Sequence, residues 1–224
     1  RWIRIGASTF CDGGDFLTEE GSTATASIGP QSSYNDLRYW IDTVQSELHL
    51  HTYQFMSTEL TGAVIDAIER GVEVTILLEE GILDGASTVD NQRGHAQAIH
   101  DAGGLVLWMD DPSQISSPYR YIHSKVAVKD SESVWISSGN WKESSVPVDQ
   151  TGNREWSLIV NSVELADLVM SRMDWDENQN SLHISTHQPR HSPSSEWTMA
   201  PEQNSTPTNA PEYVSGPFDG NLMT

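Results

Sequence analysis

The chain has 224 residues, and its 12 lysines and arginines against 32 aspartates and glutamates give a formal net charge of −20. Hydrophobic residues make up 37% of it, enough for one core, which excludes a disordered acidic chain. The charge excludes a broad basic face for nucleic acid, the single Cys11 excludes a disulfide framework, and no apolar run is long enough to span a bilayer.

Composition divides the chain into three parts. Residues 1–22 form an N-terminal extension that starts at Arg1 without a signal segment, so we expect a processed or truncated end and leave the compartment open. We expect one domain over residues 23–182. Residues 183–224 hold six of the ten prolines and predict a tail or linker. Residues 214–217 resemble residues 27–30, because both segments end in Gly-Pro. Such a repeat is expected if a second lobe followed in a longer protein.

Strands and helices are predicted to alternate through the first half of the domain. We expect strands over 23–28, 47–55, 72–78 and 105–109, and helices over 34–46, 59–70 and 89–102. Residues 72–78 are continuously apolar, which is typical of a strand buried on both faces. The alternation indicates a parallel sheet covered by helices.

The second half of the domain changes this pattern. Two strands, 121–129 and 133–137, are joined by the short turn 130–132 and predict an antiparallel hairpin. A strand over 155–160 and a helix over 163–176 follow. The predicted fold class is therefore α/β, a mixed β-sheet sandwiched between helices.

The hairpin carries a convergent polar set. His123 and Lys125 are two residues apart and share one face of a strand. Antiparallel pairing returns Ser138 and Asn140 beside His123, which gives an imidazole, an ammonium, a hydroxyl and a carboxamide, the groups that bind a phosphate oxyanion. Asp130 stands at the turn, where a short carboxylate accepts backbone N–H groups.

The lysines of the chain are confined to the same region. The three lysines are Lys125, Lys129 and Lys142, and in so acidic a chain their clustering indicates where an anion binds. The acidic surplus itself is typical of a soluble protein, or of a surface adapted to high salt.

The spacing of these residues resembles a known signature. His-x-Lys-x4-Asp over 123–130, followed by Ser138-Gly-Asn140, is similar to the HKD motif of the phospholipase D superfamily, and the resemblance extends over about residues 23–177. Ser137 stands where that family usually has glycine. The resemblance implies a phospholipase D-like lobe.

The resemblance also implies a reaction, a two-step phosphodiester cleavage through a phosphohistidine. His123 would attack phosphorus, Lys125 and Asn140 would hold the non-bridging oxygens, and Ser138 would support them. Glu155 would orient the His123 ring by accepting its second N–H. The resemblance implies no metal and no other cofactor.

The family mechanism needs two such motifs, and this sequence contains a single one. The second histidine would come from a homodimer partner or from the remainder of a longer chain. The substrate, phospholipid or nucleic acid, and the choice between hydrolysis and transfer stay open. The alternative is an inactive phospholipase D-like lobe that serves as a dimerisation or binding module.

Further residues are candidates for contact with substrate. His51 and Tyr53 could line the pocket, and Trp141 could wall it or pack in the core. His49 and His51 form a weaker candidate metal pair. Glu79 and Glu80 could position substrate or form a solvated loop, Arg93, Arg120 and Arg154 could extend the pocket, and an apolar rim could come from Trp108, Met109, Ile115 and Tyr119. His183, His187 and His191 are expected in a solvated tail, with an adventitious metal site as the alternative.

Overall fold

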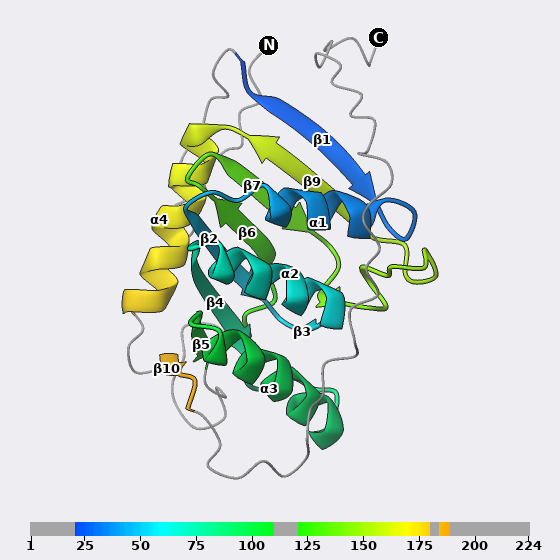
Figure 1. Cartoon of the computed structure of the whole chain (residues 1–224), viewed down its shortest axis with the longest axis vertical. Helices are drawn as coiled ribbons and strands as arrows, with labels where there is room; N and C mark the ends of the chain where they lie inside the picture. The colour runs from blue at the N-terminus through cyan, green and yellow to red at the C-terminus, as the bar shows by residue number, and fades with distance from the viewer. Residues whose placement is uncertain (1–20, 110–120, 180–183, 189–224) are drawn as a thin grey trace.

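The computed structural model describes residues 21–109, 121–179 and 184–188 (Figure 1). The helices are α1 (Ser33–Asp42), α2 (Thr58–Glu69), α3 (Ala86–Asp101) and α4 (Val163–Gln179). The strands are β1 (Thr23–Ile28), β2 (Glu47–Thr52), β3 (Phe55–Met56), β4 (Glu73–Glu79), β5 (Leu105–Met109), β6 (Lys125–Lys129), β7 (Ser133–Ser137), β8 (Trp141–Lys142), β9 (Trp156–Asn161) and β10 (Ile184–Thr186).

Eight of these strands form one mixed sheet in the order β1-β9-β7-β6-β2-β4-β5-β10, and β3 pairs with β8 in a second, small sheet. Strands β2, β4 and β5 are parallel, whereas β6, β7, β9 and β1 follow one another antiparallel. Consequently the carboxyl ends of β2, β4 and β7 and the amino ends of β6 and β9 meet at one edge of the sheet.

Helices cover both faces of the large sheet. Helices α1, α2 and α3 lie on one face and α4 on the other (Figure 1). Strand alternation produces these two layers: Ala127 belongs to the core under α1 to α3, while its neighbour Val128 packs with Val134 and Leu165 against α4. The predicted α/β class with a mixed sheet between helices is confirmed.

The ends of α2 illustrate how local sequence sets these elements. Ser57, not the following residue Thr58, caps the helix, and its Oγ accepts the N–H of Leu60 at 3.3 Å. Gly71 follows the helix with a φ of 95°, a conformation that glycine adopts without a steric penalty.

The chain stays attached to the sheet beyond the expected domain boundary at 182. Strand β10 pairs antiparallel with β5. The next residue, His187, is 4% exposed, and its Nδ1 accepts the indole N–H of Trp108 at 3.1 Å. His187 is therefore buried, not solvated as expected. His183, His191 and the expected tail from 189 onward lie outside the described residues.

A carboxylate closes the β6–β7 hairpin. Asp130 has a φ of 55°, and its Oδ1 accepts the backbone N–H of Ser46 at 2.7 Å and of Gln45 at 3.0 Å, together with the Ser46 hydroxyl at 2.9 Å. Burial would raise the pKa of this carboxyl, but the hydrogen bonds from Ser46, Gln45 and Glu47 outweigh it and lower the pKa below the ordinary value. Asp130 thus joins the hairpin turn to the start of β2.

Asp130→Ala is expected to lower the free energy of unfolding by about 1–3 kcal/mol at neutral pH, because several backbone N–H groups lose their acceptor. Since the folded-state pKa of Asp130 is lowered, its stabilisation is present above the unfolded pKa of about 3.9 and is lost as pH falls through the folded value. Urea unfolding at several pH values measures both effects. Glu132→Ala, an exposed change in the same turn, is the control. A difference between wild type and Asp130→Ala that does not vary with pH would contradict this role.

Candidate active site

His123 and Lys125 lie at the sheet edge where β6 begins. The His123 side chain is exposed, whereas Lys125 is 6% exposed. Lys125 Nζ donates to the backbone oxygen of His123 at 2.9 Å and lies 3.3 Å from its Nδ1 and 3.4 Å from its Nε2. The structure therefore brings the His123 imidazole and the Lys125 ammonium into contact.

The surroundings favour a neutral imidazole. Burial and the Lys125 charge lower the pKa of His123. Burial also lowers the pKa of Lys125, with an opposing effect from Glu155 and a further lowering by Lys142. A neutral ring beside an ammonium leaves a nitrogen lone pair available for attack on phosphorus.

Ser138 and Glu155 form a second cluster at this edge. Ser138 Oγ donates to Glu155 Oε2 at 2.5 Å, and Ser145 Oγ donates to Oε1 at 3.2 Å. A Cβ at Gly139 would lie 2.9 Å from Glu155 Cγ, so the carboxylate packs closely on this glycine. Glu155 makes no hydrogen bond to His123 in the part of the chain that the structure describes, which differs from the role that the family resemblance implied.

Ser137, the departure from the family pattern, has a local function. Its Oγ accepts the N–H of Gly139 at 3.0 Å and the hydroxyl of Ser157 at 2.9 Å. The serine therefore holds the loop that follows β7 in a way that glycine could not.

Asn140 belongs to a network that sequence reasoning missed. Gln54 Oε1 accepts from Asn140 Nδ2 at 3.1 Å and from Lys142 Nζ at 2.8 Å. Gln54 Nε2 donates to Asp84 Oδ2 at 2.5 Å. Asn140 Oδ1 is buried without a hydrogen-bond partner. The clustering of the three lysines in the sequence was a signal that Lys142 belongs to the site. No feature of the sequence pointed to Gln54.

Trp141 does not wall this site. It is 0% exposed, belongs to the main core and packs on Phe55 with 5.6 Å between ring centroids. The pairing of Phe55 with Trp141 in the β3–β8 sheet directs its ring inward. Of its two expected roles, the structure therefore shows core packing.

Tyr53 lies beside the candidate nucleophile. Its ring centroid is 5.0 Å from that of His123, and Lys125 Nζ lies 5.9 Å from it. The Tyr53 hydroxyl accepts the backbone N–H of Leu83 at 3.0 Å. The tyrosine thus borders the imidazole and the ammonium.

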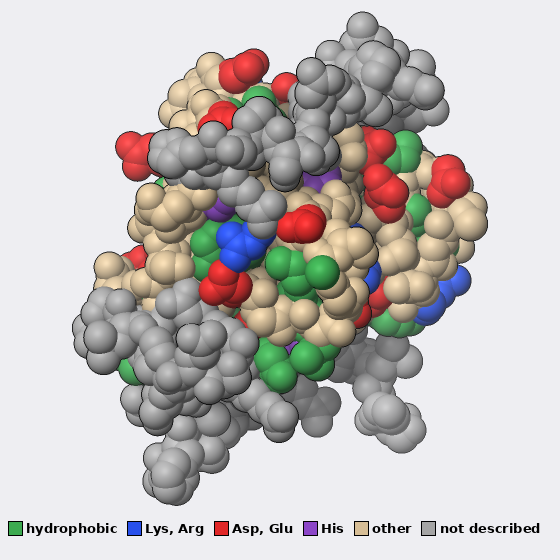
Figure 2. Space-filling view, turned by 90° about the horizontal axis from the view of Figure 1, so that it is seen from below, with side chains coloured by type: hydrophobic (Ala, Val, Ile, Leu, Met, Phe, Trp, Pro, Cys, Tyr) green, Lys and Arg blue, Asp and Glu red, His purple; other side chains and the backbone are tan. Residues whose placement is uncertain are grey.

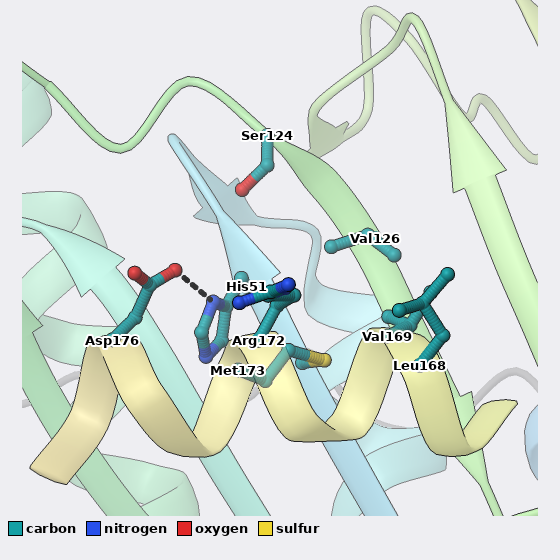
Figure 3. A pocket seen from close by; sticks show the side chains of 8 residues that line it. All are labelled: His51, Ser124, Val126, Leu168, Val169, Arg172, Met173 and Asp176. Atoms are coloured by element: carbon teal, nitrogen blue, oxygen red, sulfur yellow. Dashed lines mark ion pairs between the residues drawn. The ribbon is translucent and has the colours of Figure 1, made fainter. Parts of the chain in front are cut away.

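His51 lies elsewhere, and its expected contact with substrate beside His123 needs correction. It is 2% exposed and faces α4, where its Nε2 is 2.8 Å from Glu177 Oε1 and its Nδ1 is 3.9 Å from Asp176 Oδ2 (Figure 3). Residue pairing explains this: His51 is opposite Val126, whereas Thr52 is opposite Lys125, so the two pairs point to opposite faces. His51 lines a hollow of about 330 Å³ between α4 and the sheet.

Glu79 supports the segment that leads into His123. It is 0% exposed, its Oε2 accepts the N–H of Ile122 at 2.8 Å and its Oε1 accepts that of Gly81 at 2.9 Å. Its position at the end of a buried strand was the signal in the sequence, and of the two expected roles, substrate positioning and a solvated loop, the burial of Glu79 excludes the second. The neighbouring Glu80 pairs with Arg93 instead.

Among the described residues, the basic side chains outside the site are few and spread over different elements. The view in Figure 2 shows scattered carboxylates and few basic side chains. Arg154 donates to the oxygens of Gly29 and Gln31. Arg120 and the rim residues Ile115 and Tyr119 lie outside the described residues, and Trp108 and Met109 are buried.

Two negative findings hold for the described part of the chain. It has no cluster of three or more His, Cys, Asp or Glu side chains that could hold a metal ion. None of its helices combines the length and the hydrophobicity that crossing a membrane requires.

Comparison with known proteins gives consistent matches. Residues 37–176 match the family described as cardiolipin synthase, PLD-like domain. Over 129 residues the chain is 26% identical to a phospholipase D from Rickettsia bellii (strain RML369-C), a match that covers 57% of this chain and 55% of that protein. The chain thus spans about half the length of this curated relative.

Solved structures share the fold at lower identity. Nuc from Salmonella typhimurium, a phospholipase D family member, has a TM-score of 0.62 and 18% identity, with 75% of this chain and 99% of that chain covered. NucT from Helicobacter pylori has a TM-score of 0.56 and 16% identity, covering 74% and 99%. The phosphatidylserine synthase of Haemophilus influenzae has a TM-score of 0.55 and 13% identity, covering 77% and 41%.

His123 is expected to titrate below the ordinary histidine value of about 6.5, and Lys125→Met is expected to raise its pKa, because a charge that opposes the imidazolium is removed. An NMR pH titration of the ring protons, assigned with His123→Asn, measures both values. Lys129→Met is the control, because that ammonium bonds Trp40 and Thr43 at the other end of β6. An unchanged His123 pKa in Lys125→Met would show that the two groups are not coupled.

Proposed function

Since the chain belongs to the phospholipase D superfamily, through its cardiolipin synthase, PLD-like domain, we propose that it is a phosphodiesterase that acts through a phosphohistidine at His123. One observation carries this proposal: an exposed imidazole, with a lowered pKa, lies within 3.4 Å of a buried ammonium. The first group can attack phosphorus, and the second can neutralise the charge of the phosphoryl oxygens.

The reaction has two steps. A nitrogen of the neutral His123 ring forms a bond to phosphorus, the bond from phosphorus to the leaving oxygen breaks, and that oxygen takes a proton from an acid. Water then attacks the phosphohistidine, a base takes the water proton, and the P–N bond breaks to release a phosphomonoester. Lys125 and the free N–H of Asn140 hold the non-bridging oxygens throughout. The proposed reaction needs no metal.

The acid that protonates the leaving group is proposed to be a second histidine of the same kind. The His-x-Lys pair occurs once in this sequence, at His123 and Lys125. A second lobe of this fold, from another copy of the chain or from a longer chain, would supply the histidine. An exposed apolar strip on β7 and β9, on the sheet face that carries α4, supports a contact with another lobe: Ile136 is 41%, Leu158 38% and Trp156 60% exposed.

The substrate is proposed to be a phospholipid or a nucleic acid, because relatives that carry this fold include a phospholipase D and the proteins Nuc and NucT. The second candidate function is an inactive lobe that serves as a dimerisation or binding module. The presence of one motif, beside an exposed apolar strip, is the observation that favours it.

His123→Ala is expected to reduce hydrolysis of bis(p-nitrophenyl) phosphate by roughly a thousandfold or more, because the nucleophile is removed. Activity of the wild type should persist in excess chelator. His49→Ala is the matched control, because His49 lies on the sheet face that α4 covers. Equal activity of His123→Ala and wild type would exclude the phosphohistidine, and loss of wild-type activity with chelator would exclude the metal-independent route.

Specific activity is expected to rise with protein concentration in parallel with the fraction of paired chains, if a second copy supplies the acid. Leu158→Glu should then lower both quantities, because it places a charge in the apolar strip. Leu105→Glu, an equally exposed leucine at the start of β5, is the control. Sedimentation and initial rates on the same samples measure the effect. A fully active monomer would contradict the need for a second lobe.

A further inference from the structure

Lys142 is a second ammonium at the candidate site, in addition to the one in the motif. Strand β8 alternates, so Asn140 and Lys142 share one side while Trp141 points into the core. Both side chains donate to the same atom, Gln54 Oε1, at 3.1 Å and 2.8 Å. This shared acceptor holds the Lys142 ammonium next to the Asn140 amide.

The orientation of Gln54 is dictated by charge. Its Nε2 donates to Asp84 Oδ2 at 2.5 Å, and a carboxylate can only accept, while the Lys142 ammonium on the other side can only donate. The Gln54 amide therefore cannot be reversed without losing both contacts. Because Gln54 is 1% exposed, water cannot replace them easily. Asn140 and Lys142 are thus held in fixed relative positions.

Neither site lysine is neutralised by a carboxylate. The chain has 32 acidic and 12 basic residues, yet Lys125 and Lys142 form no ion pair among the described residues, whereas Arg38 and Arg93 do. Their hydrogen-bond partners are neutral oxygens and ring nitrogens. Lys125 pairs with Thr52, whose hydroxyl donates to the backbone oxygen of Gln54, and the Gln54 side chain accepts from Lys142, so both ammonium groups lie at the same end of the sheet. Glu155 acts on Lys125 electrostatically but does not pair with it, and Lys142 has no ion pair, so the two ammonium groups together can hold more than one anionic group.

We propose that Lys142 binds a second phosphate of the substrate, next to the phosphate that His123 attacks, and so selects a phosphodiester with another phosphate beside it, as in a nucleic acid backbone. This inference rests on the proposed function and deepens it. A single diester carries one negative charge, for which Lys125 and Asn140 suffice. A substrate with a cationic head group beside its phosphate, such as phosphatidylcholine, is repelled by the same ammonium.

The kinetic test uses two substrates that differ by one phosphate: the p-nitrophenyl ester of thymidine 3′-phosphate with a 5′-hydroxyl, and the same ester with a 5′-phosphate. Lys142→Met is expected to raise KM for the 5′-phosphorylated substrate by roughly tenfold, with kcat little changed, and to leave the 5′-hydroxyl substrate nearly unaffected, because one charge-assisted contact is lost. Lys142→Arg should retain most of the preference. Glu143→Gln, an exposed change at the next residue, is the control.

The outcomes separate this inference from the proposed function. An equal loss on both substrates, or no loss on either, overturns the role of Lys142 in binding a second phosphate. If wild type hydrolyses neither substrate, the proposed function fails, and calorimetric titration with pyrophosphate and with inorganic phosphate then tests Lys142 alone. Wild type should bind pyrophosphate roughly tenfold more tightly than Lys142→Met does. Equal pyrophosphate affinities overturn the inference.

Discussion

The edge of the sheet is organised around one buried charge, the ammonium of Lys125. An ammonium removed from water is costly unless hydrogen bonds replace its hydration. Here the Lys125 ammonium donates to the backbone oxygen of His123 at 2.9 Å, and the ring nitrogens of His123 lie 3.3 Å and 3.4 Å away, one of which can accept. None of these atoms is negative, so the positive charge stays available to an incoming anion. The same charge lowers the pKa of His123 and so favours the neutral ring. Binding of an anion by Lys125 and attack by His123 are therefore coupled.

The carboxylates near this edge accept hydrogen bonds from other donors and form no ion pair with the lysines, although the charge of Glu155 still acts on Lys125. Both oxygens of Glu155 accept serine hydroxyls, Asp84 accepts the amide of Gln54, and Glu79 accepts two backbone N–H groups. The negative charge of an acidic chain is thus used to fix loops and amides around the site. A net charge of −20 and a small cationic pocket are therefore compatible, because the acidic groups at the edge have structural partners.

The spacing of residues along the sequence predicted the features that depend on neighbouring residues alone. The hairpin and the return of the chain at residue 138 follow from period-two alternation and a short turn. The first strand of the hairpin was expected from residue 121, but β6 begins at Lys125, so His123 precedes the strand. What the sequence could not predict depends on long-range pairing. The contact of Gln54 with Asn140 joins residues 86 positions apart through the β3–β8 sheet, and that pairing also buries Trp141. Likewise Tyr53 reaches the site because β2 ends at residue 52. If the strand continued, alternation would place Tyr53 on the same face as His51, towards α4.

The lowered pKa of His123 bears on why one lobe would not complete the reaction. A nucleophile must be neutral and a leaving-group acid must be protonated at the same pH, so one histidine with a lowered pKa suits only the first role. In a pair of identical lobes both histidines would have a lowered pKa. A bound phosphate would raise the pKa of both, and the ring that forms the bond to phosphorus could not also donate a proton. The position of the leaving oxygen would then decide which ring attacks and which ring carries the proton, so the substrate itself would break the symmetry of the pair.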